Sequence, residues 1–172
     1  MNISLDFTRI ASPLGTIVVV ATNVALTGIY FDGQRYQPPV ASDWRHRPGA
    51  ELLRRASTQL AEYFSGARQR FELPLAPAGT PFQRRVWDAI ATVPSGATIS
   101  YRELAARAGA PGSARAAGAA TGRNPLSIVI PCHRIVGSDG ALTGYAGGLE
   151  RKRALLALEQ AFSIAAPVLR VA

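Results

Sequence analysis

The sequence contains a single cysteine, Cys132, and only two histidines among its 172 residues. One thiol cannot form an internal disulfide, and it excludes a metal site built from several cysteines. No apolar run approaches the roughly 20 residues that cross a bilayer, which excludes a membrane span. Residues 1–10 carry Asp6 and Arg9 and lack a basic segment followed by an apolar core, so they do not resemble a secretory signal. We therefore expect a cytoplasmic protein with a free thiol.

Acidic residues are also scarce, with 11 Asp and Glu against 19 Lys and Arg, a net charge of +8. Residues 79–172 hold 11 basic and 5 acidic residues (11 − 5 = +6), and residues 1–78 hold 8 and 6 (8 − 6 = +2). A basic surface attracts polyanions, and nucleic acids are the first candidates. Since 18 of the 19 basic residues are arginine, an arginine-rich genome is a competing explanation for the excess.

The first 31 residues have the composition of a sheet. The β-branched run 17–20 and the run 26–31, separated by a turn at Asn23, predict an antiparallel hairpin. Residues 32–49 contain several prolines and glycines and predict a loop. Apolar residues at helical spacing predict a helix from Glu51 to Phe64.

Residues 73–81 contain three prolines and one glycine, which break any periodic pattern. We place a domain boundary in this linker. Residues 1–78 are then an N-terminal α/β support domain, and residues 79–172 are a C-terminal domain that carries the thiol.

The second half opens with two helix-start signals. In residues 80–83 a threonine at the N-cap is followed by a proline and, at the third helical position, a glutamine. The helix that follows should end at residues 94–96. Residues 100–103 repeat the capping pattern and predict a second, short helix that runs to Ala108.

Residues 109–112 form a glycine-containing turn, after which Ser113 is expected to cap a third helix, 114–121. Helix, tight turn, helix is the arrangement of the helix-turn-helix, although an ordinary helical hairpin has the same pattern. Arg115 is the one long side chain in a helix made mostly of Ala and Gly. This composition favours binding of DNA by shape and backbone contact, because few side chains are present to distinguish bases.

The apolar run 126–130 followed by Pro131 predicts a buried strand that presents Cys132 at its end. Residues 137–148 are rich in glycine around Tyr145 and are expected to form a loop that faces the thiol. A last helix is expected from Leu149 to about Phe162.

A free thiol with a pKa of about 8.5 is only slightly ionised at neutral pH and needs a base to become a nucleophile. His133 is the nearest base, and the neighbouring Arg134 can also favour a thiolate. Adjacent side chains point apart, so a water molecule would have to relay the proton. Glu159 is the first candidate to orient the imidazole and Asp139 the second, while purely structural roles for these side chains remain open.

Motifs along residues 80–160 match those of one family in order and with compatible spacing. They are Phe82-Gln83-Arg84-Arg85-Val86-Trp87, Pro94-Ser95-Gly96 with Ser100-Tyr101, Ala114-Arg115-Ala116-Ala117-Gly118, Asn124-Pro125, Pro131-Cys132-His133-Arg134, Gly144-Tyr145-Ala146-Gly147-Gly148 and Glu159. On these residues the chain resembles the O6-alkylguanine-DNA alkyltransferases, or methylated-DNA–protein-cysteine methyltransferases. The resemblance implies an α+β fold with two domains: a ribonuclease-H-like antiparallel sheet with a helix, and a helical, winged-helix-like domain with a helix-turn-helix. Residues 1–78 match only in this general pattern.

The resemblance also implies a role for each matched residue. Cys132 takes the alkyl group from O6-alkylguanine, and from O4-alkylthymine, in one in-line displacement, activated by His133, water and Glu159. The helix-turn-helix binds the minor groove of duplex DNA, and the damaged base is flipped into a pocket. Arg115 replaces that base, Tyr101 donates a proton toward guanine N3, and Asn124 holds the helix-turn-helix against the active-site segment. The remaining DNA contacts expected are Ser113, Ala116, Ala117, Gly118 and Arg123, and the pocket residues expected are Pro131, Ile135, Tyr145 and Ala146.

The carbonyls of Cys132 and Ile135 would accept from the guanine amino group, and the amide of Ala146 would face O6. The product is a stable thioether, so each molecule would act once as a monomer, without cofactor or metal, in direct-reversal DNA repair. The sequence leaves cooperative assembly on DNA and the range of alkyl groups open.

Some relatives have a serine at the position of Ala146, and some bind zinc through N-terminal cysteines that this chain lacks. Three other functions fit parts of the same sequence. They are a damage sensor like the alkyltransferase-like proteins, which lack the cysteine, a cysteine hydrolase, and a small DNA-binding regulator with an incidental thiol.

Overall fold

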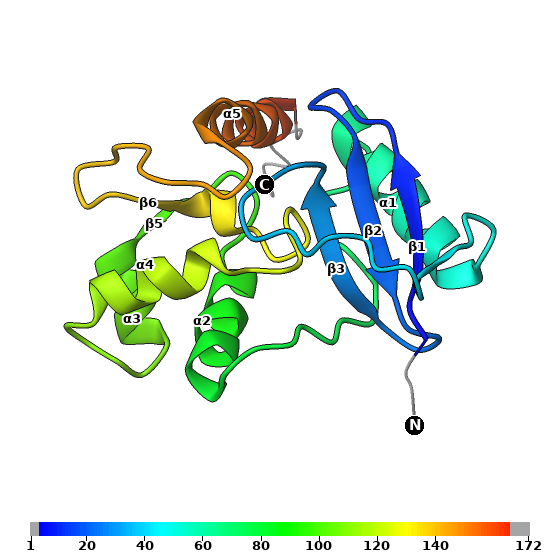
Figure 1. The fold of residues 1–172 in the computed structure, drawn as a ribbon. Helices are drawn as coiled ribbons and strands as arrows, with labels where there is room; N and C mark the ends of the chain where they lie inside the picture. The colour runs from blue at the N-terminus through cyan, green and yellow to red at the C-terminus, as the bar shows by residue number, and fades with distance from the viewer. Residues whose placement is uncertain (1–3, 166–172) are drawn as a thin grey trace.

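The computed structural model describes residues 4–165, and the side chains to residue 162. It is a mixed α+β structure, with a sheet and one helix at the N-terminal end and a group of helices at the C-terminal end (Figure 1). Among the described helices, none has the length and apolar composition needed to cross a membrane. The two-part α+β architecture predicted from the sequence is therefore confirmed.

The N-terminal sheet has the strand order β3-β2-β1-β4. β1 (Asp6–Ile10), β2 (Ile17–Ala21) and β3 (Leu26–Phe31) are antiparallel neighbours, which confirms the predicted hairpin. β4 (Arg45–His46) pairs in parallel with β1, so the prediction that all of residues 32–49 form a loop was wrong at this point. Two residues are too few for a periodic signal, and a 2.8 Å contact from Arg45 Nε to Asp6 Oδ1 fastens them to the sheet edge.

α1 (Glu51–Ser65) covers one face of this sheet with its buried residues Leu53, Ala56, Leu60 and Tyr63. It ends at Gly66, whose φ of 85° is left-handed and which donates to carbonyls of the last turn. Glycine is the residue that adopts this conformation without a steric cost, and it therefore terminates the helix.

The C-terminal half begins with α2 (Pro81–Ala91), which has the predicted capping box between Thr80 and Gln83. α3 (Tyr101–Arg107) is capped by Ser100, and α4 (Ala114–Gly122) follows after the glycine turn. Ser113 occupies the predicted N-cap position of α4, but its side chain makes no capping hydrogen bond. The remaining elements are, in chain order, β5 (Ile99–Ser100), the 3-10 helix η1 (Cys132–Arg134), β6 (Ile135–Val136), parallel to β5, and α5 (Leu149–Ala165).

Residues 126–130 do not form the predicted strand. Only Leu126 makes a β-bridge, to Ile29 of β3, and the chain then turns, with φ of 73° at Ile128 and a hydrogen bond from Ile130 N to Leu126 O. A short apolar run reports burial but cannot distinguish a strand from a buried turn. The segment therefore connects the N-terminal sheet to the helical half, and Cys132 starts a 3-10 helix.

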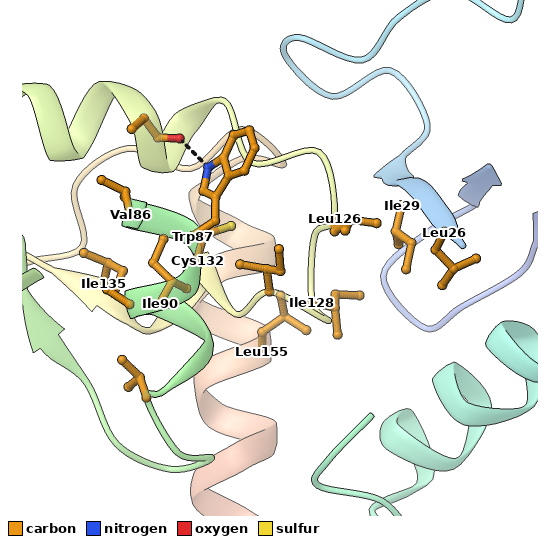
Figure 2. Close-up of a cluster of buried hydrophobic side chains, with 14 of the residues drawn as sticks. Leu26, Ile29, Val86, Trp87, Ile90, Leu126, Ile128, Cys132, Ile135 and Leu155 are labelled. Atoms are coloured by element: carbon orange, nitrogen blue, oxygen red, sulfur yellow. Dashed lines mark hydrogen bonds between the residues drawn. The ribbon is translucent and has the colours of Figure 1, made fainter. Parts of the chain in front are cut away.

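One hydrophobic cluster includes residues from both halves of the chain (Figure 2). Leu26 and Ile29 of β3 belong to it together with Trp87 of α2 and Leu155 of α5. The indole Nε1 of Trp87 donates to Ala120 O of α4 at 2.9 Å, which ties α2 to α4. Cys132 belongs to the same cluster, so the thiol is held by the core of the protein.

Candidate active site

Cys132 lies at the wall of a cavity of about 290 Å³. The cavity is also lined by Tyr101 of α3, by Gly118 and Ala119 of α4, and by Tyr145. Only 4% of Cys132 is exposed, so the thiol is reached through this cavity and is otherwise enclosed. The volume is at the lower end of the roughly 300 to 1,000 Å³ typical of ligand pockets, which suits one small aromatic group.

Asn124 connects the thiol to the backbone around it. Its Nδ2 donates to Ile130 O at 2.8 Å and lies 3.1 Å from Cys132 Sγ. Burial raises the pKa of the Cys132 thiol, and this is opposed by the Asn124 amide, by Lys152 and by the backbone amides of Cys132 and His133. The net direction is upward, so the thiol is protonated at rest and requires a base before it can react.

His133, the next residue in the chain after Cys132, is paired with Glu159 in the interior of the protein. His133 Nε2 lies 2.8 Å from Glu159 Oε1, and both side chains are fully buried. Burial lowers the pKa of His133 despite the opposing effect of Glu159, so the imidazole is neutral. Since a carboxylate accepts hydrogen bonds, Nε2 carries the proton and Nδ1 is the basic nitrogen. Among the residues that the structure describes, Nδ1 has no hydrogen-bond partner.

Several hydrogen-bond donors surround Glu159 and keep it ionised as a carboxylate. Arg134 donates to both of its oxygens, at 2.8 and 2.9 Å, and Tyr63 Oη of α1 donates to Oε1 at 2.8 Å. Burial raises the pKa of Glu159, but the hydrogen bonds from His133 and Arg134 outweigh it and hold the pKa well below its ordinary value. Arg134 therefore acts on Glu159. That Arg134 also favours a thiolate at Cys132 stays a prediction from the sequence.

Asp139 does not orient His133. Its Oδ1 accepts a 3.0 Å hydrogen bond from Ala141 N within the exposed 137–141 turn. Of the two carboxylates considered for orienting His133, the structure therefore places Glu159, and not Asp139, against the imidazole.

The glycine-rich loop 137–148 reaches the cavity through its second half. Tyr145 and Ala146 line the cavity beside Cys132. Pro131 instead lines a separate cavity, and Ile135 is fully buried, so neither side chain is placed at the thiol pocket. The carbonyls of Cys132 and Ile135 already accept from Ile135 N and Lys152 Nζ respectively, and each keeps a second lone pair.

Lys152 is a site residue that no sequence pattern singles out. It is fully buried, and its ammonium donates to Ile135 O, Thr143 O and Gly144 O. Burial lowers its pKa to about 8. The three acceptors join β6 and the 143–146 loop, so Lys152 fixes the loop that carries Tyr145 and adds positive potential near the thiol. A lysine inside a helix with an Arg-Lys-Arg sequence gives no signal of burial.

The helix α4 has both exposed and buried residues among those expected to contact DNA. Arg115 and Ala116 are exposed and Gly118 borders the cavity, but Ala117 is 0% exposed. Ala117 therefore belongs to the core, and its expected contact with DNA is excluded.

Tyr101 Oη donates to Thr143 O at 3.0 Å, and burial raises the pKa of Tyr101, so its hydroxyl keeps its proton.

Two family models match the chain. The model described as the 6-O-methylguanine DNA methyltransferase ribonuclease-like domain matches residues 6–77, and the DNA binding domain of the same family matches residues 81–161. The chain belongs to the 6-O-methylguanine DNA methyltransferase family. Within the part of the chain that the structure describes, no group of three His, Cys, Asp or Glu side chains is arranged to hold a metal ion.

Relatives of this methyltransferase-family chain cover nearly its whole length. A methylated-DNA–protein-cysteine methyltransferase of Mycolicibacterium paratuberculosis is 44% identical over 159 residues, 92% of this chain and 94% of its own. The crystal structure of the Mycobacterium tuberculosis O6-methylguanine methyltransferase superposes with a TM-score of 0.86 at 44% identity, covering 95% of this chain and 96% of its own. The M. tuberculosis protein in complex with DNA gives a TM-score of 0.85 at 43% identity over 91% and 94%.

We expect acid to destabilise this methyltransferase-family fold through Glu159 and His133. The pKa of Glu159 is lower in the fold than the ordinary value of about 4.3, so its contribution is complete above that pH and is lost below it. The pKa of His133 is also lowered in the fold, so stability falls as the pH drops below its ordinary value of about 6.5. The urea midpoint should therefore decrease from pH 7 to pH 4. Below about pH 4, where the contribution of Glu159 is lost, the midpoint should decrease further. In that lower range the variant Glu159→Gln should show a shallower decrease, and equal slopes would contradict this origin.

Proposed function

We propose that the protein repairs DNA by moving the alkyl group of O6-alkylguanine onto Cys132, in a reaction that each molecule performs once. The observation that carries the proposal is a buried thiol at the wall of a base-sized cavity, with a neutral imidazole bonded to a carboxylate beside it. Relatives with 44% identity carry the name methylated-DNA–protein-cysteine methyltransferase. Intact-mass measurement after incubation with a duplex that contains O6-methylguanine tests this function.

The reaction balances without a cofactor. A water molecule passes the thiol proton to His133 Nδ1, and the imidazolium formed is stabilised by Glu159. The thiolate attacks the alkyl carbon, the S–C bond forms, and the C–O6 bond breaks. The leaving guanine takes a proton at N3 from Tyr101 Oη, and the proton on His133 returns to the tyrosinate through solvent. The carbon–oxygen bond of O4-alkylthymine would be cleaved in the same way.

The product explains why no second cycle follows. A thioether has no carbonyl for water to attack and no good leaving group, and the Cys132 sulfur is enclosed by the core. Among the described residues, we identify no side chain that could remove the alkyl group from the sulfur. The protein would therefore be consumed in proportion to the lesions that it repairs.

Binding of the substrate would involve α4 in the minor groove of duplex DNA, with the damaged nucleotide turned into the cavity. The exposed Arg115 would fill the space left by the base, while Gly118 allows close approach beside Tyr101. Asn124 would link this helix segment to the thiol. We further propose that the protein acts as a cytoplasmic monomer. We also propose that the boundary between its two domains in the sequence lies between residues 78 and 79.

The variant Arg115→Ala is expected to slow repair of O6-methylguanine in duplex DNA about 10-fold or more, since it removes the side chain that holds the base out of the stack. Reaction with free O6-benzylguanine, which needs no flipping, should change much less. Single-turnover rates with the two substrates measure the difference. Equal losses on both substrates would refute the role of Arg115 in base extrusion.

A further inference from the structure

A loop of the N-terminal domain forms part of the rim of the Cys132 cavity. Arg35 and Tyr36, which follow β3, line the cavity together with Gly122 of α4. From the sequence, residues 32–49 were predicted only as a loop. Its position at the rim means that the N-terminal domain can contact whatever enters the cavity.

Three contacts fix this loop to the C-terminal half. Gln34 is buried, and its Oε1 accepts from Ser127 Oγ at 3.2 Å. Arg35 N donates to Ala146 O at 3.0 Å, and the Arg123 guanidinium carbon lies 3.9 Å from the centroid of the Tyr36 ring. The loop is therefore held against both the 143–146 segment and the end of α4.

Tyr36 has a strained backbone, with φ of 65°, a conformation that non-glycine residues rarely adopt. Its side chain is 44% exposed, so the strain is not offset by burial of the ring. Backbone strain of this kind persists where surrounding contacts impose it, and it is concentrated at functional sites. Here it holds the ring where two cations stack on it.

The Arg35 guanidinium carbon lies 4.8 Å from the same ring centroid, so Tyr36 carries two arginines, one from each domain. Both arginines are exposed, and neither guanidinium has a carboxylate partner or donates a side-chain hydrogen bond within residues 4–162. Stacking occupies the flat face of a guanidinium and leaves its in-plane N–H donors free. Two cations held close together without a counter-ion form a site for an anion with several oxygens.

We propose that Arg35 and Arg123, held on Tyr36, bind the phosphate backbone of the DNA strand that carries the extruded nucleotide. The inference rests on the proposed function, because a base inside the cavity leaves its own phosphates at the rim. The N-terminal domain thereby becomes part of the DNA-binding surface, and it clamps the strand on the side of the cavity formed by Arg35 and Tyr36.

The test compares Arg35→Gln, Arg123→Gln and the double variant with Arg54→Gln. Arg54 is an exposed arginine of α1, which lies at the far end of the molecule from α3 and α4 (Figure 1). Binding to a fluorescent duplex with and without O6-methylguanine is measured between about 50 and 200 mM salt. The double variant should reduce the slope of log affinity against log salt by about 1 to 2, roughly one for each phosphate that is no longer neutralised by an arginine. Arg54→Gln should leave the slope at the wild-type value.

The ring is tested separately with Tyr36→Phe, which keeps the stacking surface, and Tyr36→Leu, which removes it. Tyr36→Leu should reduce the salt slope as the arginine variants do, and Tyr36→Phe should restore it. In single-turnover assays the double variant should slow repair of the duplex lesion about 10-fold relative to its effect on free O6-benzylguanine.

A salt slope in the double variant equal to that of Arg54→Gln would overturn the proposal. Failure of the wild-type protein to acquire an alkyl group from either substrate would instead refute the proposed function. In that case the salt slopes of duplex binding would still decide whether Arg35 and Arg123 contact phosphate, so the two failures are distinguishable.

Discussion

Incubation of the protein with excess duplex DNA that contains O6-methylguanine is expected to add one methyl group, about 14 Da, to Cys132 and then to stop. The expectation follows from the enclosed sulfur and from the neutral His133 beside it, which together allow one displacement and no hydrolysis of the product. Intact-mass spectrometry gives the stoichiometry, and peptide mapping locates the modified residue.

Cys132→Ser is the matched control, because it keeps the size of the side chain and replaces the sulfur with a far weaker nucleophile. It should form no adduct while still binding the duplex. Product that continues to accumulate after one equivalent would indicate a hydrolase. Duplex binding by the wild type without any adduct would indicate a damage sensor.

Replacement of Glu159 is the second change for which we expect a large effect. The variant Glu159→Gln leaves Arg134 and His133 buried without their negative partner, and breaking a buried ion pair in this way costs about 3 to 5 kcal/mol. Urea unfolding measures that decrease in stability. On the folded protein, the rate of alkyl transfer should fall while affinity for the duplex persists, because Glu159 is fully buried and has no surface for DNA to contact.

Glu150→Gln serves as the control on the same helix, since Glu150 is exposed and its one ion pair within the described residues is with Arg153. It should change neither the stability nor the rate. The double variant with Glu159→Leu and Arg134→Met separates the effect on stability from the effect on rate. Because it removes both buried charges, it should recover much of the stability, while the rate of alkyl transfer should stay low. An unchanged rate in Glu159→Gln would remove the carboxylate from the proton relay.

The elements with strong local signals were predictable from the sequence. The hairpin of β2 and β3 and the capping box at Thr80 depend on neighbouring residues, and each has the predicted form. The apolar segment 126–130 was misjudged because its conformation is set by Ile29 and the surrounding core, which are distant in the sequence.

The same distinction applies to the candidate site. The pairing of His133 with Glu159 was anticipated, and the structure places these two side chains 2.8 Å apart. The contributions of Tyr63 and Lys152 were not anticipated, because a tyrosine in an amphipathic helix and a lysine in a charged run resemble ordinary core and surface residues. Their roles arise from interactions over long sequence separations, which spacing alone does not report.

The hydrophobic cluster that the two halves share has a consequence for thermodynamics. Two domains with independent cores would melt separately, whereas residues from β3, α2 and α5 pack here into one cluster that includes the reactive cysteine. Denaturation of either half would expose apolar surface of the other, so the chain should behave as one cooperative unit with a single calorimetric transition. The two domains recognised in the sequence are therefore not two independent folding units. Neither domain is expected to stay folded when it is expressed alone.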